Sequence, residues 1–169
     1  MAYTPDIVNY KPFWIQFDSV PMAWDTRQWG LVAKTNPFPI LPNPKAPYVN
    51  KWHDENGEEE YTDNLHYEAY EFEVTFYKKC FDTEVESADA IMRKELDTFF
   101  SNIKSKEFMI FDSYTGIGRR KVRYAGFSEE SYKRRSGKNG WAVAIFKIKF
   151  KVNDPVTRIV KVNQKLMEE

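Results

Sequence analysis

The stretch SGKNGWAVAIFKIKFKV, residues 136–152, decides the fold class of this chain. Near its start lies Asn139-Gly140, a dipeptide typical of the tight turns of β-hairpins. Apolar and charged residues then alternate, which predicts a half-buried strand over residues 141–152. The residues on its inner face are Ala142, Ala144, Phe146, Ile148, Phe150 and Val152, and Lys147, Lys149 and Lys151 face outward. The preceding RKVRYAGF, residues 120–127, is the other strand of this hairpin, with a basic and an apolar face.

Four further strands and one helix are predicted upstream of the hairpin. EAYEFEVTFYKKC, residues 68–80, alternates like a half-buried strand, and EFMIFD (107–112), PFWIQF (12–17) and WGLVAK (29–34) are short and β-prone. Ser87 is a typical N-cap of an amphipathic helix that continues to Ile103. Its apolar face holds Ile91, Met92, Leu96, Phe99 and Phe100. The expected fold is α+β: mainly an antiparallel β-sandwich or split barrel with one amphipathic helix packed on it.

The length of 169 residues fits a single domain, 1–169. It divides into an N-terminal segment (1–27), the predicted β and α elements, a proline-rich arm (36–49) and a C-terminal tail (156–169). Five prolines lie between positions 37 and 47, and they are incompatible with a helix or a central strand. This segment is therefore expected to be an extended arm or long loop.

The composition excludes several classes of protein. The chain is 42% hydrophobic and 17% aromatic, enough for a core, and its formal net charge is zero, so no global basic field attracts nucleic acid or an anionic membrane. The sequence has no export signal, a single cysteine and no apolar run of about 20 residues that would span a bilayer. We expect a protein made in a reducing cytoplasm.

The stretch SYTGIGRRKVRYAGF, residues 113–127, resembles a phosphate-binding loop at first sight because Gly116 and Gly118 lie two apart. Phosphate loops lead into a helix, whose N-terminal N–H groups bind the anion. These glycines lead into a strand instead, so an ordinary turn is favoured.

No constellation of residues predicts catalysis, a metal site or a cofactor. His53, Asp54 and Glu55 are consecutive, so their side chains point apart on an extended chain and do not share one metal ion. Cys80 with His53 or His66 has no supporting motif, and a buried inert thiol is favoured. We expect no enzyme, although an enzyme with a cleft at the acidic loop is kept as an alternative.

Charge is distributed unevenly along the neutral chain. Residues 119–138 hold eight Lys or Arg and two Glu, whereas residues 52–77 hold nine acidic residues and no Lys or Arg. Basic residues interleaved with aromatic ones are also typical of single-stranded nucleic-acid binding. A nucleic-acid-binding module that uses the basic hairpin 119–138 is therefore a second alternative. A solvated basic face, with Glu71 and Glu73 paired to Lys147 and Lys149, is the simpler interpretation.

The order of elements resembles a known family. The strand YEAYEFEVTFYKKC, the helix ADAIMRKELDTFFSNIKSK, the strand EFMIFDSYTG and the hairpin from KVRYAGFSEESYKRR to WAVAIFKIKFKV follow one another between Gln28 and Pro155. This succession resembles the ring-forming N-terminal domain of siphophage distal tail proteins and, more broadly, the phage tail-tube fold. Distal tail proteins often continue into a second domain, whereas this chain ends at Glu169, and the proline-rich arm is longer than the family leads us to expect.

The resemblance implies a non-catalytic tail or baseplate protein that forms a ring, typically hexameric, around the tail channel. Its partners would be copies of itself and other tail proteins, with no membrane and with DNA at most as passing cargo. It would be made in the bacterial cytoplasm and reside in the virion tail.

The opposite charges suggest how copies meet, because head-to-tail contacts close into rings when the rotation permits. We predict that Arg134 and Arg135 contact Glu58, Glu59 and Glu60 of a neighbouring copy. Arg119, Lys121 and Arg123 are predicted to line that contact or the channel.

Overall fold

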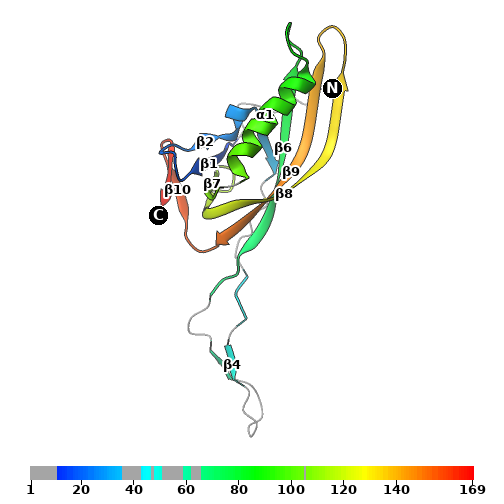
Figure 1. Cartoon of the computed structure of the whole chain (residues 1–169). Coiled ribbons are helices and arrows are strands. Elements are labelled where there is room, and N and C mark those ends of the chain that lie inside the picture. Colours follow the sequence, from blue (N-terminus) through cyan, green and yellow to red (C-terminus); the bar gives the residue numbers. More distant parts are fainter. Residues whose placement is uncertain (1–10, 36–42, 47, 51–58, 62–65, 105) are drawn as a thin grey trace.

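The computed structural model describes residues 11–35, 43–46, 48–50, 59–61, 66–104 and 106–169. Its main element is a seven-stranded antiparallel sheet in the order β2-β1-β7-β8-β9-β6-β3 (Figure 1). The strands are β1 (Phe13–Phe17), β2 (Trp24–Asp25), β3 (Val32–Thr35), β6 (Tyr70–Phe81), β7 (Phe108–Asp112), β8 (Ile117–Arg135) and β9 (Trp141–Asp154). One helix, α1 (Ala88–Ile103), and one 3-10 turn, η1 (Thr26–Trp29), complete this part of the fold.

The longest ladder without a register shift joins β6 to β9, from Tyr70 opposite Val152 to Phe81 opposite Trp141. Every second β9 residue from Ala142 to Val152 is buried, which confirms the alternation predicted from the sequence. β8 pairs with the other edge of β9, and the turn between them holds Gly137 and Asn139 with positive φ. The predicted hairpin therefore forms the centre of the sheet.

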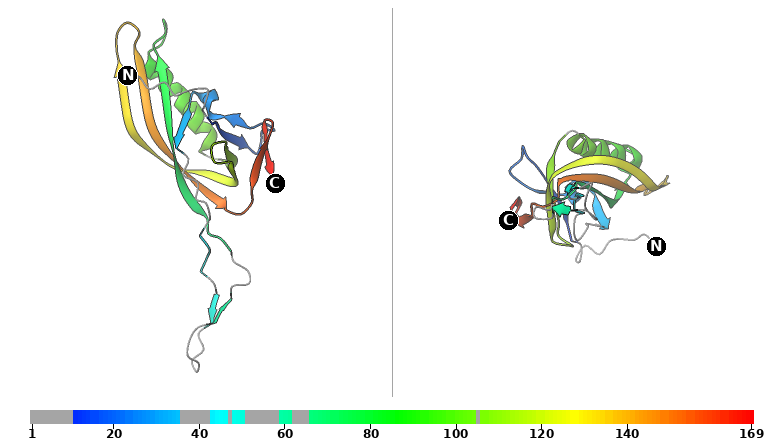
Figure 2. Two further views of the ribbon diagram at one scale, coloured as in Figure 1. Left: turned by 180° about the vertical axis from the view of Figure 1, so that it is seen from behind. Right: turned by 90° about the horizontal axis from the view of Figure 1, so that it is seen from below.

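Helix α1 covers one face of this sheet (Figure 2). Ser87 caps it as predicted, because its hydroxyl accepts a hydrogen bond from the Ala90 N–H. The Asp82 carboxylate accepts a second one from the Ala88 N–H at 2.7 Å. Met92, Phe99 and Ile103 are fully buried, and the other predicted apolar positions (Ile91, Leu96, Phe100) pack against the core while partly buried.

The sheet curls around its core instead of lying flat. Phe13 of β1 packs against Phe76 of β6 at 6.1 Å between ring centroids and against Phe150 of β9 at 6.2 Å, although several strands separate them in the sheet order. The two edge strands, β2 and β3, are joined directly by η1, yet no ladder pairs them among the described strands. The mainly antiparallel fold with one helix is confirmed, and the ladders show an open, curled sheet that establishes neither a sandwich nor a barrel.

The C-terminal residues form a two-stranded hairpin, β10 (Ile159–Val162) and β11 (Lys165–Glu168). Ile159 and Leu166 are buried against Ala23 and the neighbouring side chains of β1 and β7. The Leu166 N–H donates to the buried Gln16 side chain at 2.6 Å, which ties the hairpin to β1. The predicted C-terminal tail is thus packed on the domain.

A second hairpin lies far from the sheet. β4 (Tyr48–Asn50) pairs with β5 (Glu59–Tyr61), and an isolated bridge joins Pro44 to Tyr67 nearer the sheet. The described residues of the proline-rich arm and those of the acidic segment therefore lie side by side, in a projection at the end of the molecule opposite the β8–β9 turn (Figure 1). Most of the proline-rich stretch, including Pro37, lies outside the described residues.

Among the described residues, no helix is long and apolar enough to cross a membrane.

Candidate assembly surfaces

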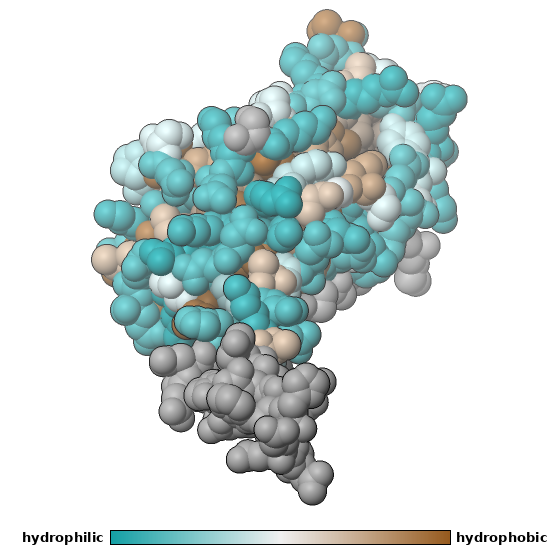
Figure 3. Space-filling model, turned by 60° about the horizontal axis from the view of Figure 1, so that its bottom comes forward, coloured by the Kyte–Doolittle hydropathy of each residue, from teal (hydrophilic) through white to brown (hydrophobic). Residues whose placement is uncertain are grey.

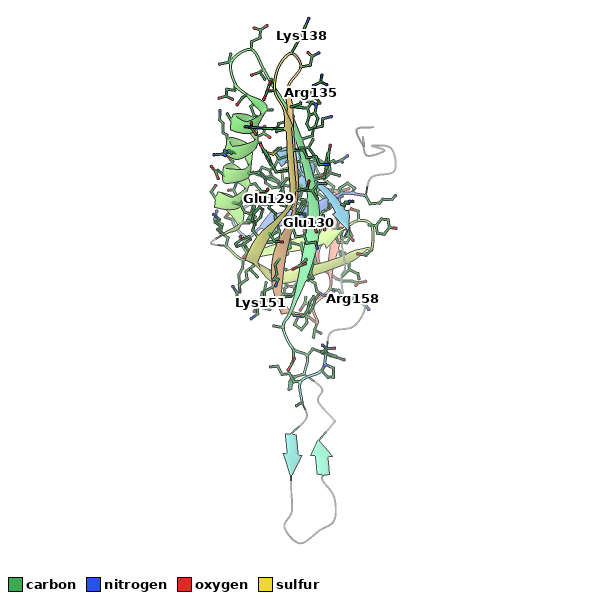
Figure 4. The ribbon with its side chains drawn as sticks, turned by 90° about the vertical axis from the view of Figure 1, so that its right-hand side faces the viewer. Glu129, Glu130, Arg135, Lys138, Lys151 and Arg158 are labelled. Carbon is green, nitrogen blue, oxygen red and sulfur yellow. The ribbon has the colours of Figure 1, made fainter. Side chains whose placement is uncertain are left out.

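The predicted basic segment follows β8 and its turn into β9. Of its eight basic residues, Lys121, Arg123, Lys133, Arg134, Arg135 and Lys138 are exposed. Arg135 and Lys138 lie at the turn end of the hairpin, and β4 and β5 lie at the other end of the molecule (Figure 4). Basic side chains and the acidic projection are thus separated along the long axis.

Arg119 does not belong to this exposed set. It is only 9% exposed, and one guanidinium nitrogen donates to the Gly118 carbonyl at 2.9 Å. Burial raises the pKa of the Tyr70 hydroxyl, and the nearby charge of Arg119 partly opposes this shift. Arg119 is buried because strict alternation of the strand faces fails near Lys121, where φ is +50° and the β7–β8 register shifts. Of the three residues predicted to line a contact or channel, Lys121 and Arg123 are the accessible ones.

Arg120 is committed to internal ion pairs. Its guanidinium lies 2.5 Å from Asp154 and also pairs with Glu168 of β11. Burial by itself would raise the pKa of Asp154, but hydrogen bonds from Arg120 and Thr157 outweigh it and lower that pKa. These contacts fasten the C-terminal hairpin to the start of β8.

Arg134 also has a partner within the chain. It lies 3.3 Å from Asp89 at the start of α1, and the Tyr132 hydroxyl donates to the same carboxylate. The hydrogen bond from Tyr132, followed by Arg134, lowers the pKa of Asp89, while burial and Asp89 raise the pKa of Tyr132 to about 12. Arg135 faces the opposite side of the sheet, next to Trp141. The two arginines predicted to act together therefore point to different faces.

The acidic side of the predicted contact is described only in part. Glu59 and Glu60 belong to β5, where their backbones pair with Asn50 and Val49, whereas Glu58 lies outside the described residues. The contact of Arg134 and Arg135 with these glutamates therefore remains a prediction.

The strand charges pair within the chain, as the simpler interpretation expected for Lys149 but with a different partner for Lys147. Lys149 lies 3.9 Å from Glu71 and 4.0 Å from Glu73, while Lys147 bonds Glu130 at 2.8 Å. Hydrogen bonding with Glu130 raises the pKa of Lys147. These exposed pairs involve only charges along the strands, and they do not engage Arg135 or Lys138 at the β8–β9 turn.

One edge of β8 is unpaired over much of its length. β7 covers β8 only as far as Val122, so from Arg123 to Arg135 the strand pairs with β9 alone among the described strands. Register shifts in the β8–β9 ladder near Ala125 and Glu130 make β8 irregular along this stretch, and charged side chains flank its unpaired edge. Both features discourage uncontrolled pairing with other chains.

An apolar strip that the sequence reasoning missed lies on the sheet face opposite α1. Trp141, Val143 and Ile145 of β9 stand beside Tyr77 and Phe81 of β6. Phe81 is 58% exposed, and the Lys79 ammonium lies over its ring at 4.8 Å from the centroid. The signal in the sequence was WAVAI, where residues of both alternating faces are apolar. On the face drawn in Figure 3, by comparison, hydrophilic side chains dominate and apolar ones form separate patches.

Residues 113–116 form the turn between β7 and β8, and Gly118 already lies in β8, so these glycines lead from an ordinary turn into a strand, as favoured from the sequence. The Asp112 carboxylate accepts hydrogen bonds from the N–H groups of Tyr114 and Thr115, and Gly116 has φ of +71°. A side chain at Gly118 would overlap the Ile159 carbonyl, so this glycine allows the C-terminal hairpin to pack closely.

The candidate chemical residues are described only in part. His53, Asp54 and Glu55 lie outside the described residues, and His66 is exposed near the base of the projection. Cys80 is buried, and this burial raises the pKa of its thiol. The described residues include no group of three or more His, Cys, Asp or Glu able to hold a metal ion.

Comparisons with known proteins show the fold. No family model matches the chain, and no curated protein matches it. A solved structure, SPP1 Dit (gp 19.1), described as a paradigm of the hub adsorption apparatus in phages that infect Gram-positive bacteria, superposes with a TM-score of 0.55 at 12% sequence identity. The match covers 88% of this chain and 52% of the SPP1 Dit chain, so this chain spans about half the length of that protein. The described chain therefore has a Dit-like fold, in agreement with the resemblance seen in the sequence.

Proposed function

We propose that this protein is a non-catalytic structural component of a phage or prophage tail or baseplate, which assembles into a ring around the tail channel. The observation that carries the proposal is the fold likeness to SPP1 Dit across 88% of the chain. Its location is the virion tail, after synthesis in the bacterial cytoplasm. Its partners are further copies of the chain, in a hexamer if the family resemblance extends that far, and other tail or baseplate proteins.

The distribution of charge supports a head-to-tail contact between copies. The basic turn of β8–β9 lies at one end of the molecule, and the projection that contains Glu59 and Glu60 lies at the other. A contact between two different surfaces of the same protein is heterologous, and repetition of such a contact forms a ring or a filament. In this proposal, Arg134 and Arg135 contact Glu58, Glu59 and Glu60 of the next copy, and Lys121 and Arg123 line the contact or the channel.

The structure refines how this contact is tested. Because Arg134 is already paired with Asp89, reversing its charge also disturbs the start of α1. Arg135 and Lys138 are exposed at the same turn, and no ion pair engages them among the described residues. The informative variant is therefore Arg135→Glu with Lys138→Glu.

Light scattering and negative-stain microscopy test the proposal. The wild type should form closed rings at low salt that weaken at high salt, because the proposed contact is electrostatic. Arg135→Glu with Lys138→Glu should give monomers, and Glu58→Lys with Glu59→Lys should restore rings in that background. Lys94→Glu, an exposed reversal on α1, is the matched control and should leave assembly unchanged. A wild type that stays monomeric at high concentration and low salt would contradict ring assembly.

Nucleic-acid binding by the basic hairpin 119–138 receives less support from the structure. Arg119 is buried, and Arg120 and Arg134 are engaged in ion pairs, so three of the eight basic residues are occupied inside the chain. DNA then remains at most a passing cargo of the channel. The wild type could instead bind single-stranded DNA in a salt-sensitive way and lose that binding in Lys121→Glu with Arg123→Glu. This result would favour nucleic-acid binding over the structural role.

A further inference from the structure

A buried arginine near the start of β8 carries a charge that no described residue neutralises. Arg119 is 9% exposed and forms no ion pair with a described residue, whereas its neighbour Arg120 pairs with Asp154. The Nη1 of Arg119 donates to the Gly118 carbonyl at 2.9 Å, but its Nε is buried without a hydrogen-bond partner among the described residues. A buried guanidinium in this state is costly, because a carbonyl accepts a hydrogen bond without cancelling the charge.

A second buried group beside Arg119 also lacks a partner. The hydroxyl of Tyr70, at the start of β6, is buried and has no hydrogen-bond partner among the described residues. Burial raises the pKa of this hydroxyl and the charge of Arg119 opposes the rise, so the two groups are neighbours. They come from separate strands, because β9 lies between β6 and β8, with Val152 opposite both Tyr70 and Val122. Both residues keep some exposed surface, so they are not sealed from solvent.

The acidic side chains beside Arg119 in the sheet are used by other groups. Asp154 of β9 lies 2.5 Å from Arg120. The buried carboxylate of Asp112, at the end of β7, accepts hydrogen bonds from two N–H groups of the β7–β8 turn. Neither carboxylate forms an ion pair with Arg119. The described part of the chain therefore supplies no counter-ion for this arginine.

The donors that remain indicate which ligand fits. Because Nη1 of Arg119 is used, the planar guanidinium presents Nε and Nη2 along its other edge, which matches the two oxygens of a carboxylate. The Tyr70 hydroxyl adds a third donor. Water would accept a hydrogen bond from Nε but leave the charge, and a dianion such as phosphate would bring more charge than one arginine offsets. We propose that Arg119 and Tyr70 bind the carboxylate group of a small organic acid. This proposal does not depend on ring assembly.

Nuclear magnetic resonance of the ¹⁵N-labelled full chain tests the proposal with formate, the smallest carboxylate. Sodium formate replaces sodium chloride up to about 100 mM at constant ionic strength, enough to reveal a Kd of roughly 10 mM or tighter. The Nε–H signal of Arg119 should shift in a saturable way, and sodium bromide, a spherical monoanion, should not reproduce the shift. If copies assemble, the variant Arg135→Glu with Lys138→Glu is used, because its changes lie at the far end of β8. No saturable shift with formate, or an equal response to bromide, would overturn the proposal.

Variants identify the two groups that bind, through the rise in melting temperature that formate causes. Tyr70→Phe removes only the buried hydroxyl and should weaken formate binding about fivefold or more, because hydrogen bonds to a charged group are strong. Arg119→Lys keeps the charge but loses the planar edge, so binding should fall about tenfold or more. Arg123→Lys, at an exposed position of the same strand, is the matched control and should bind like the wild type. Equal stabilisation of the wild type and Tyr70→Phe by formate would overturn the assignment, whether or not Arg119→Lys folds.

Discussion

The buried lysine of β6 leads to an asymmetric prediction about stability. Lys78 is 1% exposed, donates to the Trp29 carbonyl at 2.7 Å and pairs with Glu95 of α1, whose side chain is 47% exposed. Removing Glu95 leaves a buried cation without its counter-ion, whereas removing Lys78 leaves a carboxylate that water already reaches. The two halves of one ion pair should therefore differ greatly in their effect.

Glu95→Gln should lower the free energy of unfolding by about 3 kcal/mol, the lower end of the range for breaking a buried pair, because Glu95 is half exposed. Lys78→Met keeps most of the side-chain volume and removes the buried charge. Its only new cost is the unpaired Trp29 carbonyl, so its effect should stay within about 1 kcal/mol. In the double variant, the Glu95 substitution should add almost nothing to Lys78→Met.

Urea denaturation followed by circular dichroism, repeated at several protein concentrations, measures these differences. Lys94→Met is the matched control, because Lys94 is exposed and its pair with Glu86, at 3.7 Å, is expected to contribute less than about 1 kcal/mol. A larger loss for Lys78→Met than for Glu95→Gln would refute the argument from charge burial.

Three further predictions concern the core, the C-terminal hairpin and the helix start. Phe99→Ala should cost about 3 to 5 kcal/mol in urea denaturation, because Phe99 is fully buried against Trp29 and Phe76, and a loss under about 1 kcal/mol would contradict its packing. The lowered pKa of Asp154 means that its carboxylate stabilises the fold in full above about pH 4 and loses this effect gradually at lower pH. In thermal melts the destabilisation by Asp154→Asn should therefore be largest at pH 7 and shrink as the pH falls below about 4, and a deficit that does not change with pH would contradict this. Gly140→Ala should lower the melting temperature, because a Cβ there would overlap the Asp82 carboxylate that caps α1, and an unchanged melt would show that this loop yields freely.

The elements with strong periodicity could be predicted from the sequence alone. β9 alternates without interruption, and α1 has both an N-cap and a regular apolar face, so local pattern and tertiary burial agree. Phe99 and Phe146 are as buried as their positions indicated. The burial of these residues follows the period of a helix or a strand because each lies within one regular element.

The candidate contact residues were harder to predict because their environment depends on other elements. The positive φ of Lys121 shifts the face of Arg119, and no property of the sequence RRKVR announces it. Arg134 is paired because α1 brings Asp89 beside it, a contact across 45 positions. The proline-rich and acidic segments were assigned separately, although strand pairing joins them. A surface hollow lined by Trp14, Trp24, Gln28 and Gln164 draws its residues from four separate parts of the chain, and no sequence motif marks it.

The position of the first strands has a consequence for synthesis of the chain. β1 pairs with β7, and the side chains of Trp14 and Ser113 that meet there are 99 positions apart. β9, which completes the ladders of both β6 and β8, follows later still. During translation, the aromatic strand FWIQF can therefore pair early only with the two-residue β2, and its longer ladder with β7 has to wait until most of the chain has been synthesised. Such non-local pairing slows folding and exposes apolar strands, so yield from a cell should depend on chaperone capacity more than on final stability.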